Sequence, residues 1–198
     1  NARNMGIAAT SAPFILPLDA DDKLSPLYIK IVMPVLRENP KLKVAYTDAK
    51  HFGINHDYAE RSTVNMRVLC SRNLFQPTAL FRRSDFGRTS GYRPHIFGYE
   101  DWDMWLQLID TPEQARRIPD ALFFQRIKEF SMIVELRSNA ELERKIRKQI
   151  YSYNRLKYQL HAPELAFSYE RQLADKDRIF IIKYRLQRLF MRLKGISK

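Results

Sequence analysis

The sequence is poor in cysteine and contains no long apolar run. Cys70 is the single cysteine among 198 residues, which excludes an internal disulfide and a four-cysteine zinc site. This count is compatible with a reducing compartment. No apolar stretch approaches the roughly 20 residues that a membrane-spanning helix requires. The printed residues therefore predict no helical membrane span.

The composition is that of a globular protein with an uneven charge. Apolar residues make up 45% of the chain and aromatic residues 12%, which is typical of a folded rather than a disordered protein. The length allows one sizeable core, or one domain with a helical appendage. Residues 139–198 contain 15 Lys and Arg against 6 Asp and Glu, so they carry +9 of the net +12. An anionic partner would be attracted to this C-terminal part.

One acidic stretch follows a short apolar run. Residues 14–18 are predicted to form a buried strand, and Asp19, Asp21 and Asp22 come directly after it. In α/β sheets, ligands bind beyond the carboxyl ends of the strands. Carboxylates this close repel one another unless a cation shares the site, and hard oxygen ligands suit Mg²⁺ or Mn²⁺. Alternatively, Asp21 and Asp22 only cap the following helix.

A second stretch, residues 97–108, combines carboxylates with two tryptophans. Trp102 and Trp105 are predicted to anchor a buried helix that begins near Asp101. Acidic residues in the first turn complement the helix dipole, and this alone would explain Glu100 and Asp101. The competing interpretation is a general base held at a rigid helix end. Indole faces often pack against sugar rings, although a buried tryptophan is more often simply core.

The remaining elements follow from apolar spacing and from turn residues. Helices are expected over residues 1–10 and from Ser25 and Pro26 onward, since serine caps a helix and proline suits its first turn. Further strands are predicted at 43–48, 76–82 and 118–126, the last after a turn at Ile118 and Pro119. Residues 51–73 show no clean period, which predicts a long and partly mobile connection.

The C-terminal part is predicted to be helical. Ser138 and Glu141 have the spacing of a capping box. The long helix that they open would place on one face Leu142, Ile146, Ile150, Tyr153 and Leu156. A last helix over 176–193 is amphipathic and basic, and such a helix can lie on an anionic membrane, bind nucleic acid or dock on its own domain.

Together these motifs resemble those of a family 2 glycosyltransferase, an inverting enzyme with the GT-A fold. The residues that carry the resemblance are Ala2-Arg3-Asn4-Met5-Gly6-Ile7-Ala8, Leu18-Asp19-Ala20-Asp21-Asp22, Tyr99-Glu100-Asp101-Trp102-Asp103-Met104-Trp105-Leu106, Ile118-Pro119, Leu122, Arg126 and Ser131-Met132. The resemblance covers residues 1–132, a partial catalytic domain, and leaves 133–198 as a basic helical extension. It implies an α/β fold, a GT-A-like (Rossmann-like) mixed sheet flanked by helices.

The resemblance implies transfer of a sugar from a nucleotide-sugar donor, with a UDP-sugar favoured, to an acceptor hydroxyl. Asp19 and Asp21 match the DxD motif, which holds Mn²⁺ or Mg²⁺ and contacts the donor. Arg3 and Asn4 match positions beside the donor pocket. Single displacement inverts the anomeric centre, so no covalent nucleophile is needed. The lack of a Ser/His/Asp or Cys/His pattern is consistent with that.

Further residues receive roles from the same resemblance. Asp101 matches the general base that takes the proton of the acceptor hydroxyl, while Glu100 and Trp102 would shape the acceptor pocket. Arg126 would contact the diphosphate. Family members often have a histidine two residues after that arginine, and here the position is Lys128. A protonated lysine cannot ligate a metal, but it can pair with the diphosphate.

The resemblance also sets expectations for the whole protein. A family domain begins with a βαβ unit of the nucleotide pocket, which is missing before Asn1, so we expect this chain alone to bind donor poorly and to transfer little sugar. The expected enzyme is of the hexosyltransferase type. Its acceptor would be a saccharide or lipid-linked saccharide in cell-surface polysaccharide or lipopolysaccharide biosynthesis.

The expected location is cytoplasmic, with possible peripheral attachment to the inner face of the membrane through residues 176–198. The alternative is a basic peripheral membrane or nucleic-acid-binding module without catalysis. Nucleic acid is not favoured as a partner, since no helix-turn-helix or RNP-type pattern is present. The tyrosines of the tail are spaced as one face of a helix, namely Tyr151, Tyr153 and Tyr158.

Overall fold

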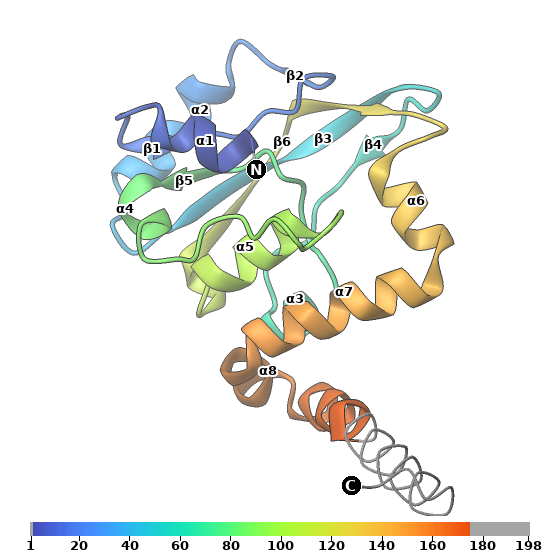
Figure 1. Cartoon of the computed structure of the whole chain (residues 1–198). Helices are drawn as coiled ribbons and strands as arrows, with labels where there is room; N and C mark the ends of the chain where they lie inside the picture. Colours follow the sequence, from blue (N-terminus) through green and yellow to red (C-terminus); the bar gives the residue numbers. More distant parts are fainter. Residues whose placement is uncertain (1, 175–198) are drawn as a thin grey trace, which may run out of the picture.

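The chain forms a curled mixed β-sheet flanked by helices, which confirms the predicted α/β class. The structure is a computed structural model that describes residues 2–174 (Figure 1). The strands, in the order β1-β5-β3-β6-β2, are β1 (Phe14–Ile15), β5 (Leu80–Arg82), β3 (Val44–Gly53), β6 (Ala115–Ile127) and β2 (Lys23–Leu24), with β4 (Tyr58–Ala59) paired to β3. β3 and β6 run parallel, whereas the other pairs are antiparallel.

Helices cover both faces of this sheet. They are α1 (Ala2–Ala8), α2 (Tyr28–Arg37), α3 (Met66–Ser71), α4 (Arg83–Phe86), α5 (Glu100–Leu108), α6 (Met132–Ser138), α7 (Ala140–Tyr153) and α8 (Arg155–His161), with a 3₁₀ turn at Pro112–Gln114. Residues 163–174 are also helical. Within the described residues, no helix combines the length and the apolar character needed to cross a bilayer.

Alternating side chains of β3 divide the interior into two cores. Val44 and Tyr46 face the larger core, which contains the indoles of α5, whereas Ala45 faces the smaller core beneath α2. Figure 1 shows α5 between the sheet and the group formed by α3, α7 and α8. The sheet and the C-terminal helices therefore hold α5 from both sides.

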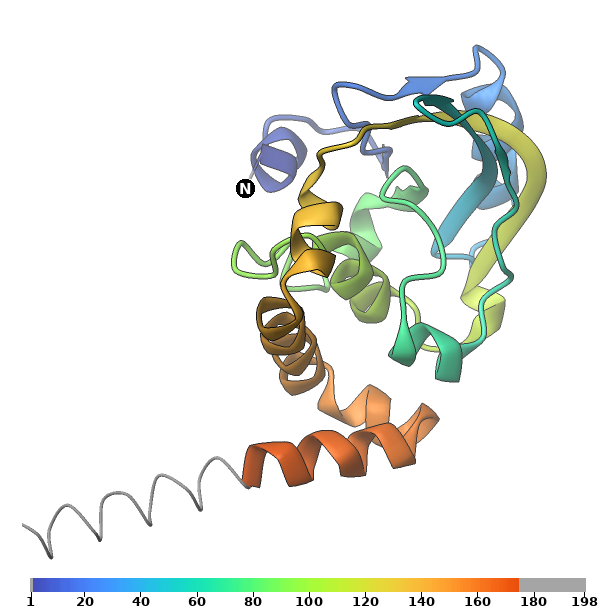
Figure 2. The same cartoon turned by 90° about the vertical axis from the view of Figure 1, so that its right-hand side faces the viewer.

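The first C-terminal helices share the larger core with Trp102. Their buried members are Leu136, Ile146, Ile150, Tyr151 and Tyr158. The helix at 163–174 packs against α7 and α8 (Figure 2), where Tyr169 stacks on Tyr151 with ring centroids 4.9 Å apart and Ala166 is buried. The boundary between residues 132 and 133 stays a prediction. The predicted basic helix at 176–193 lies outside the described residues.

The prediction for residues 51–73 is wrong. β3 continues to Gly53, β4 follows, and α3 occupies the end of the segment. Leu69 is fully buried there and Cys70 almost so. α3 packs against α8 and against α5, where Trp102 Nε1 donates to the Leu69 carbonyl, and the local sequence contains no period that reveals it.

The predicted capping box at Ser138 is also wrong. Ser138 is the last residue of α6, and Asn139 caps α7 by accepting a hydrogen bond from the Leu142 amide at 3.0 Å. The helix then ends at Tyr153, with Asn154 as its C-cap, so Leu156 falls on the separate helix α8 and is exposed. Tyr151 and Tyr158 occupy the interior instead.

The predicted strand at 14–18 and the predicted turn at Ile118 and Pro119 differ from the structure. The strand expected at 14–18 is only two residues long, and the chain leaves the sheet after Ile15. The turn expected at Ile118 and Pro119 lies inside β6, where the register to β3 shifts between Thr47 and Ala49. An irregular pairing of this kind accommodates a proline that cannot donate to the ladder.

Candidate active site

The structure brings four motifs that are distant in sequence to one place. Arg3 of α1 forms an ion pair with Asp19 after β1 at 2.7 Å and with Glu100 at the start of α5 at 3.0 Å. Burial opposes the charge of Arg3, but the two carboxylates outweigh it and raise the pKa of its guanidinium. Arg3 therefore connects the acidic loop to the helix that contains Asp101.

The acidic loop at 19–22 is fastened to the chain after β6. Lys128 Nζ lies 2.5 Å from Asp21 Oδ2, and the Arg126 amide donates to Asp22 Oδ1 at 2.7 Å. The Arg126 side chain also donates from Nε to the Asp21 carbonyl at 3.1 Å. The hydrogen bond from Lys128 lowers the pKa of Asp21. Burial, with repulsion from Asp21 and Asp19, raises the pKa of Asp22 to about 6.

The alternative that Asp21 and Asp22 only cap a helix is wrong. Helix α2 begins at Tyr28 after Leu27, and no side chain caps it. Both carboxylates instead contact the segment that contains Arg126 and Lys128. The acidic cluster is therefore part of a site between two segments and not a helix terminus.

Asp101 is a buried carboxylate with two hydrogen-bond donors. Its side chain accepts from Asn73 Nδ2 at 2.8 Å through Oδ2 and from the Trp102 amide at 2.9 Å through Oδ1. The residue is 9% exposed. Burial and the neighbouring charge of Glu100 raise the pKa of Asp101 to about 6. It is thus ionised at neutral pH while remaining a stronger base than an ordinary aspartate.

The start of α5 agrees with the sequence prediction. The helix begins at Glu100, with three acidic residues in its first turn. The helix-dipole explanation for Glu100 and Asp101 therefore remains valid beside the functional one. Glu100 also has a buried oxygen, Oε2, that finds no hydrogen-bond partner among the described residues.

Trp102 lies in the core beneath this site. It is 1% exposed, and its indole Nε1 donates to the Leu69 carbonyl at 2.6 Å. Trp105 is fully buried and stacks on Phe75 with ring centroids 4.9 Å apart. In this arrangement Trp102 supports Asp101 from below, and its predicted part in an acceptor pocket would be indirect.

Asn4 fastens a loop next to the site. Its side chain donates to the Tyr92 carbonyl at 2.8 Å and accepts from the Tyr92 amide at 2.9 Å. Gly91 has a φ of +68°, and a Cβ there would lie 3.1 Å from Asn4 Oδ1. A larger residue at Gly91 would therefore strain this loop.

Several residues of the site were missed by the sequence analysis. Tyr92 is buried below Arg3, whose guanidinium lies 5.5 Å from its ring centroid, and its hydroxyl has no partner among residues 2–174. The side chains of Lys23 and Arg126 both lie over the ring of Phe52, at 4.9 and 4.5 Å. Lys23 follows the acidic stretch directly, but Asn73, Tyr92 and Phe52 have no local signal.

Asp19 and Asp21 suit a metal ion that is bound jointly by protein carboxylates and by a substrate. No group of three or more His, Cys, Asp or Glu side chains is placed for a metal ion in the part of the chain that the structure describes. Asp19 and Asp21 are 41% and 39% exposed at their side chains, so both can be reached. Mg²⁺ is commonly bound through one or two carboxylates together with substrate phosphates, and the two aspartates fit that use.

Comparison with known proteins shows the fold. No family model matches the chain, and no curated protein does. Among solved structures it resembles residues 1–349 of TarS from S. aureus, a glycosyltransferase, at 15% identity and a TM-score of 0.51 over 84% of this chain and 52% of that one.

Two further structures of TarS 1–349, both with bound ligand, are similar to the same extent. The complex with UDP-GlcNAc matches at 15% identity and a TM-score of 0.51, over 83% of this chain and 54% of that one. The complex with UDP matches at 16% identity and a TM-score of 0.51, over 84% and 53%. This chain thus shares the fold of these structures and spans about half of their length.

Proposed function

We propose that the chain forms part of an inverting glycosyltransferase that moves a sugar from a nucleotide-sugar donor to an acceptor hydroxyl. One observation supports this most strongly: the buried base candidate Asp101 adjoins Glu100, which Arg3 connects to the loop of Asp19 and Asp21. TarS, which shares the fold, has been solved with UDP-GlcNAc and with UDP. A UDP-sugar is therefore the donor that we favour.

In this proposal, Asp101 accepts the proton of the attacking hydroxyl. Asn73 and the Trp102 amide hold its carboxylate in one orientation. Its pKa of about 6 keeps it deprotonated at neutral pH and still close to the operating pH, as efficient proton transfer requires. Glu100 would form the wall of the acceptor pocket, with Trp102 supporting it from the core.

The donor diphosphate would lie between the acidic loop and the cations around it. Arg126 and Lys128 would bind its oxygens, since guanidinium and ammonium groups both pair with phosphate. Arg3 and Asn4 would border the donor. Asp19 and Asp21 would hold Mn²⁺ or Mg²⁺, and when bound this ion neutralises charge on the departing diphosphate. Lys128, which pairs with Asp21 in this structure, would then pair with the phosphates instead.

Calorimetric titration of UDP tests this proposal. We expect Mn²⁺-dependent binding to the chain when it is preceded by the βαβ unit that the resemblance predicts, and weak binding to residues 1–198 alone. Asp21→Asn should remove the Mn²⁺ dependence, because it removes one of two anionic ligands. Asp120→Asn, an exposed change on β6, is the matched control. UDP binding to neither chain would contradict the proposal and favour a non-catalytic basic module.

The acceptor and the location belong to the same proposal. A saccharide or lipid-linked acceptor of cell-surface polysaccharide synthesis would place the enzyme at the cytoplasmic face of a membrane, where residues 176–198 would bind anionic lipid. Deleting 176–198 is expected to abolish co-sedimentation with anionic vesicles, because most of the basic charge of the tail lies there. Unchanged partitioning would contradict this attachment.

A further inference from the structure

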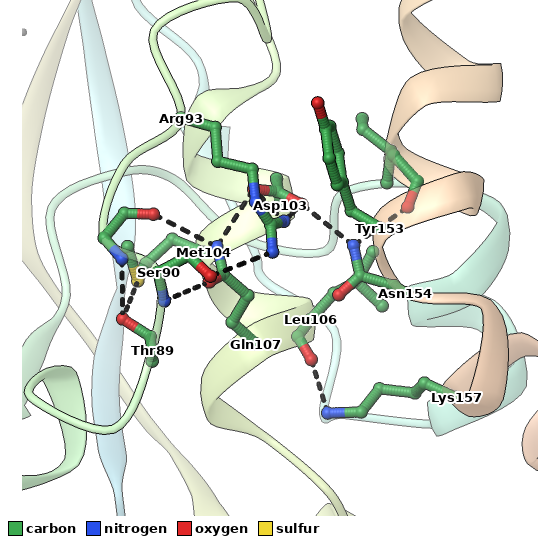
Figure 3. Close-up of polar contacts among 12 residues, drawn as sticks. Thr89, Ser90, Arg93, Asp103, Met104, Leu106, Gln107, Tyr153, Asn154 and Lys157 are labelled. Atoms are coloured by element: carbon green, nitrogen blue, oxygen red, sulfur yellow. Dashed lines mark hydrogen bonds and ion pairs between the residues drawn. The ribbon is translucent and has the colours of Figure 1, made fainter.

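A basic cleft lies beside α5, between the loop at 88–93 and the junction of α7 with α8. Its volume is about 470 Å³. Figure 3 shows that side chains from all three segments point into this region. None of the residues that line it is acidic, and four are cationic, namely Arg88, Arg93, Arg155 and Lys157. The other polar members are Thr89, Ser90, Gln107, Ser152, Tyr153 and Asn154.

Arg93 is held rigidly in this cleft. Its Nη1 lies 2.6 and 2.8 Å from the two oxygens of Asp103, and its guanidinium carbon lies 4.4 Å from the ring centroid of Tyr153. Asp103 is fully buried and also accepts from Gln107 and Asn154. The Asp103 carboxylate beneath the cleft therefore neutralises the charge of Arg93, and it forms no ion pair with the other cations of the cleft.

Two of the remaining cations can still bind a ligand. Lys157 is already satisfied by Asp110 and by the carbonyls of Leu106 and Ile109. Arg155 has one ion pair, to Glu170, and its side chain is 49% exposed. Arg88 is exposed and forms no ion pair with any residue between 2 and 174. The guanidinium groups of Arg88 and Arg155 are thus the ones with hydrogen-bond donors to spare.

We propose that this cleft binds an oxyanion of the phosphate class, at a site separate from the proposed transfer site. Guanidinium groups bind phosphate through parallel hydrogen bonds, and the hydroxyls of Thr89 and Ser90 line the same cleft. Tyr153 is 47% exposed and Leu156 81%, so the cleft also presents apolar surface beside the charges. Such a mixture suits a phosphate group attached to a saccharide.

The phosphate has two possible sources, which experiment can separate. It can be free inorganic phosphate, or it can belong to a phosphate-bearing saccharide that serves as acceptor. The second source rests on the proposed transferase function. Either ligand would contact the loop that Asn4 fastens through Tyr92, so occupancy of the cleft would also restrain the border of the proposed donor site.

A titration of the ¹⁵N-labelled chain with inorganic phosphate, at constant ionic strength, tests the site by NMR. Saturable shift changes are expected for the amides of Ser90 and Asn154. The double variant Arg88→Gln/Arg155→Gln is expected to weaken binding by on the order of tenfold or more, since charge-assisted hydrogen bonds are lost. Arg116→Gln removes an exposed arginine of β6 and should leave the affinity unchanged.

Two outcomes would overturn the site. The first is the absence of saturable chemical-shift changes for the amides of Ser90 and Asn154. The second is that Arg116→Gln weakens phosphate binding as much as the double variant does, because this would show that phosphate is attracted only by the net positive charge. A second titration compares glucose 1-phosphate with glucose and with phosphate. If glucose 1-phosphate binds more tightly than phosphate, the ligand is a phosphate-bearing acceptor. If the two bind equally, the ligand is free phosphate. Neither result depends on whether UDP binds, so the two proposals fail independently.

Discussion

Replacing Asp101 by asparagine is expected to lower the turnover of sugar transfer by roughly 10²–10⁴-fold, the usual contribution of a positioned general base. The substitution keeps the size of the side chain and an acceptor for the Trp102 amide, and Asn73 can reverse its own amide to pair with it. It also removes a buried carboxylate whose charge is disfavoured by burial. The variant should therefore be at least as stable as the wild type at pH 7.

The measurement is the transfer rate of the chain with its predicted βαβ unit, taken as a function of pH. In the wild type kcat/KM should rise with pH through about 6, because Asp101, whose pKa is raised to about 6, must lose its proton to act as a base. In Asp101→Asn, kcat/KM should no longer rise with pH around 6, whereas Asp120→Asn should keep both the rate and the pH dependence of the wild type. Transfer by Asp101→Asn at the wild-type rate would show that the base is another group.

Replacing Asp103 by leucine is expected to lower the free energy of unfolding by about 3–5 kcal/mol, the range for removing one partner of a buried ion pair. Asp103 is fully buried, and its two oxygens accept from Arg93, Gln107 and Asn154 (Figure 3). Leucine would leave these donors unpaired. Since the donors come from the loop before α5, from α5 itself and from the α7–α8 junction, the C-terminal helices would lose one of their polar connections to the rest of the fold.

Denaturation in guanidinium chloride, followed by tryptophan fluorescence, measures this effect. The control is Asp110→Asn, which weakens ion pairs of an aspartate whose side chain is 57% exposed and should cost less than about 1 kcal/mol. Adding Arg93→Met to Asp103→Leu should recover part of the loss, because it removes the unpaired buried charge. A cost for Asp103→Leu no greater than that of the control would show that this network does not stabilise the fold.

Local sequence was sufficient where short-range chemistry decides the structure. Helix α5 begins at Glu100, beside the predicted start near Asp101, because acidic residues favour a helix N-terminus and the two tryptophans need burial. The α/β class was implied by the family resemblance and agreed with the short strands and helices expected along the chain. The resemblance to family 2 glycosyltransferases assigned Arg3 and Asp19 to the donor and Glu100 to the acceptor pocket, and the structure joins the three in one ion-pair cluster.

Local sequence failed where two signals compete. Ser138 and Asn139 are both good capping residues, and only the packing of α6 against α7 decides that Asn139 begins the second helix. Likewise, the apolar spacing predicted that Tyr153 and Leu156 face the core. A break at Asn154, whose side chain is drawn to Asp103 at 2.8 Å, turns the following helix away.

The sequence by itself determined the position of α5, because this depends on burial patterns and on contacts between neighbours in the chain. Its motifs, through their resemblance to a known family, also indicated the fold class and the residues around the acidic loop. Only the tertiary structure decided that Asn73 and Tyr92 adjoin this site, that Trp102 lies beneath it, and that four cations meet in a cleft behind α5. These contacts join residues tens of positions apart. Their strength comes from burial in the folded chain, and no local pattern of residue types encodes that.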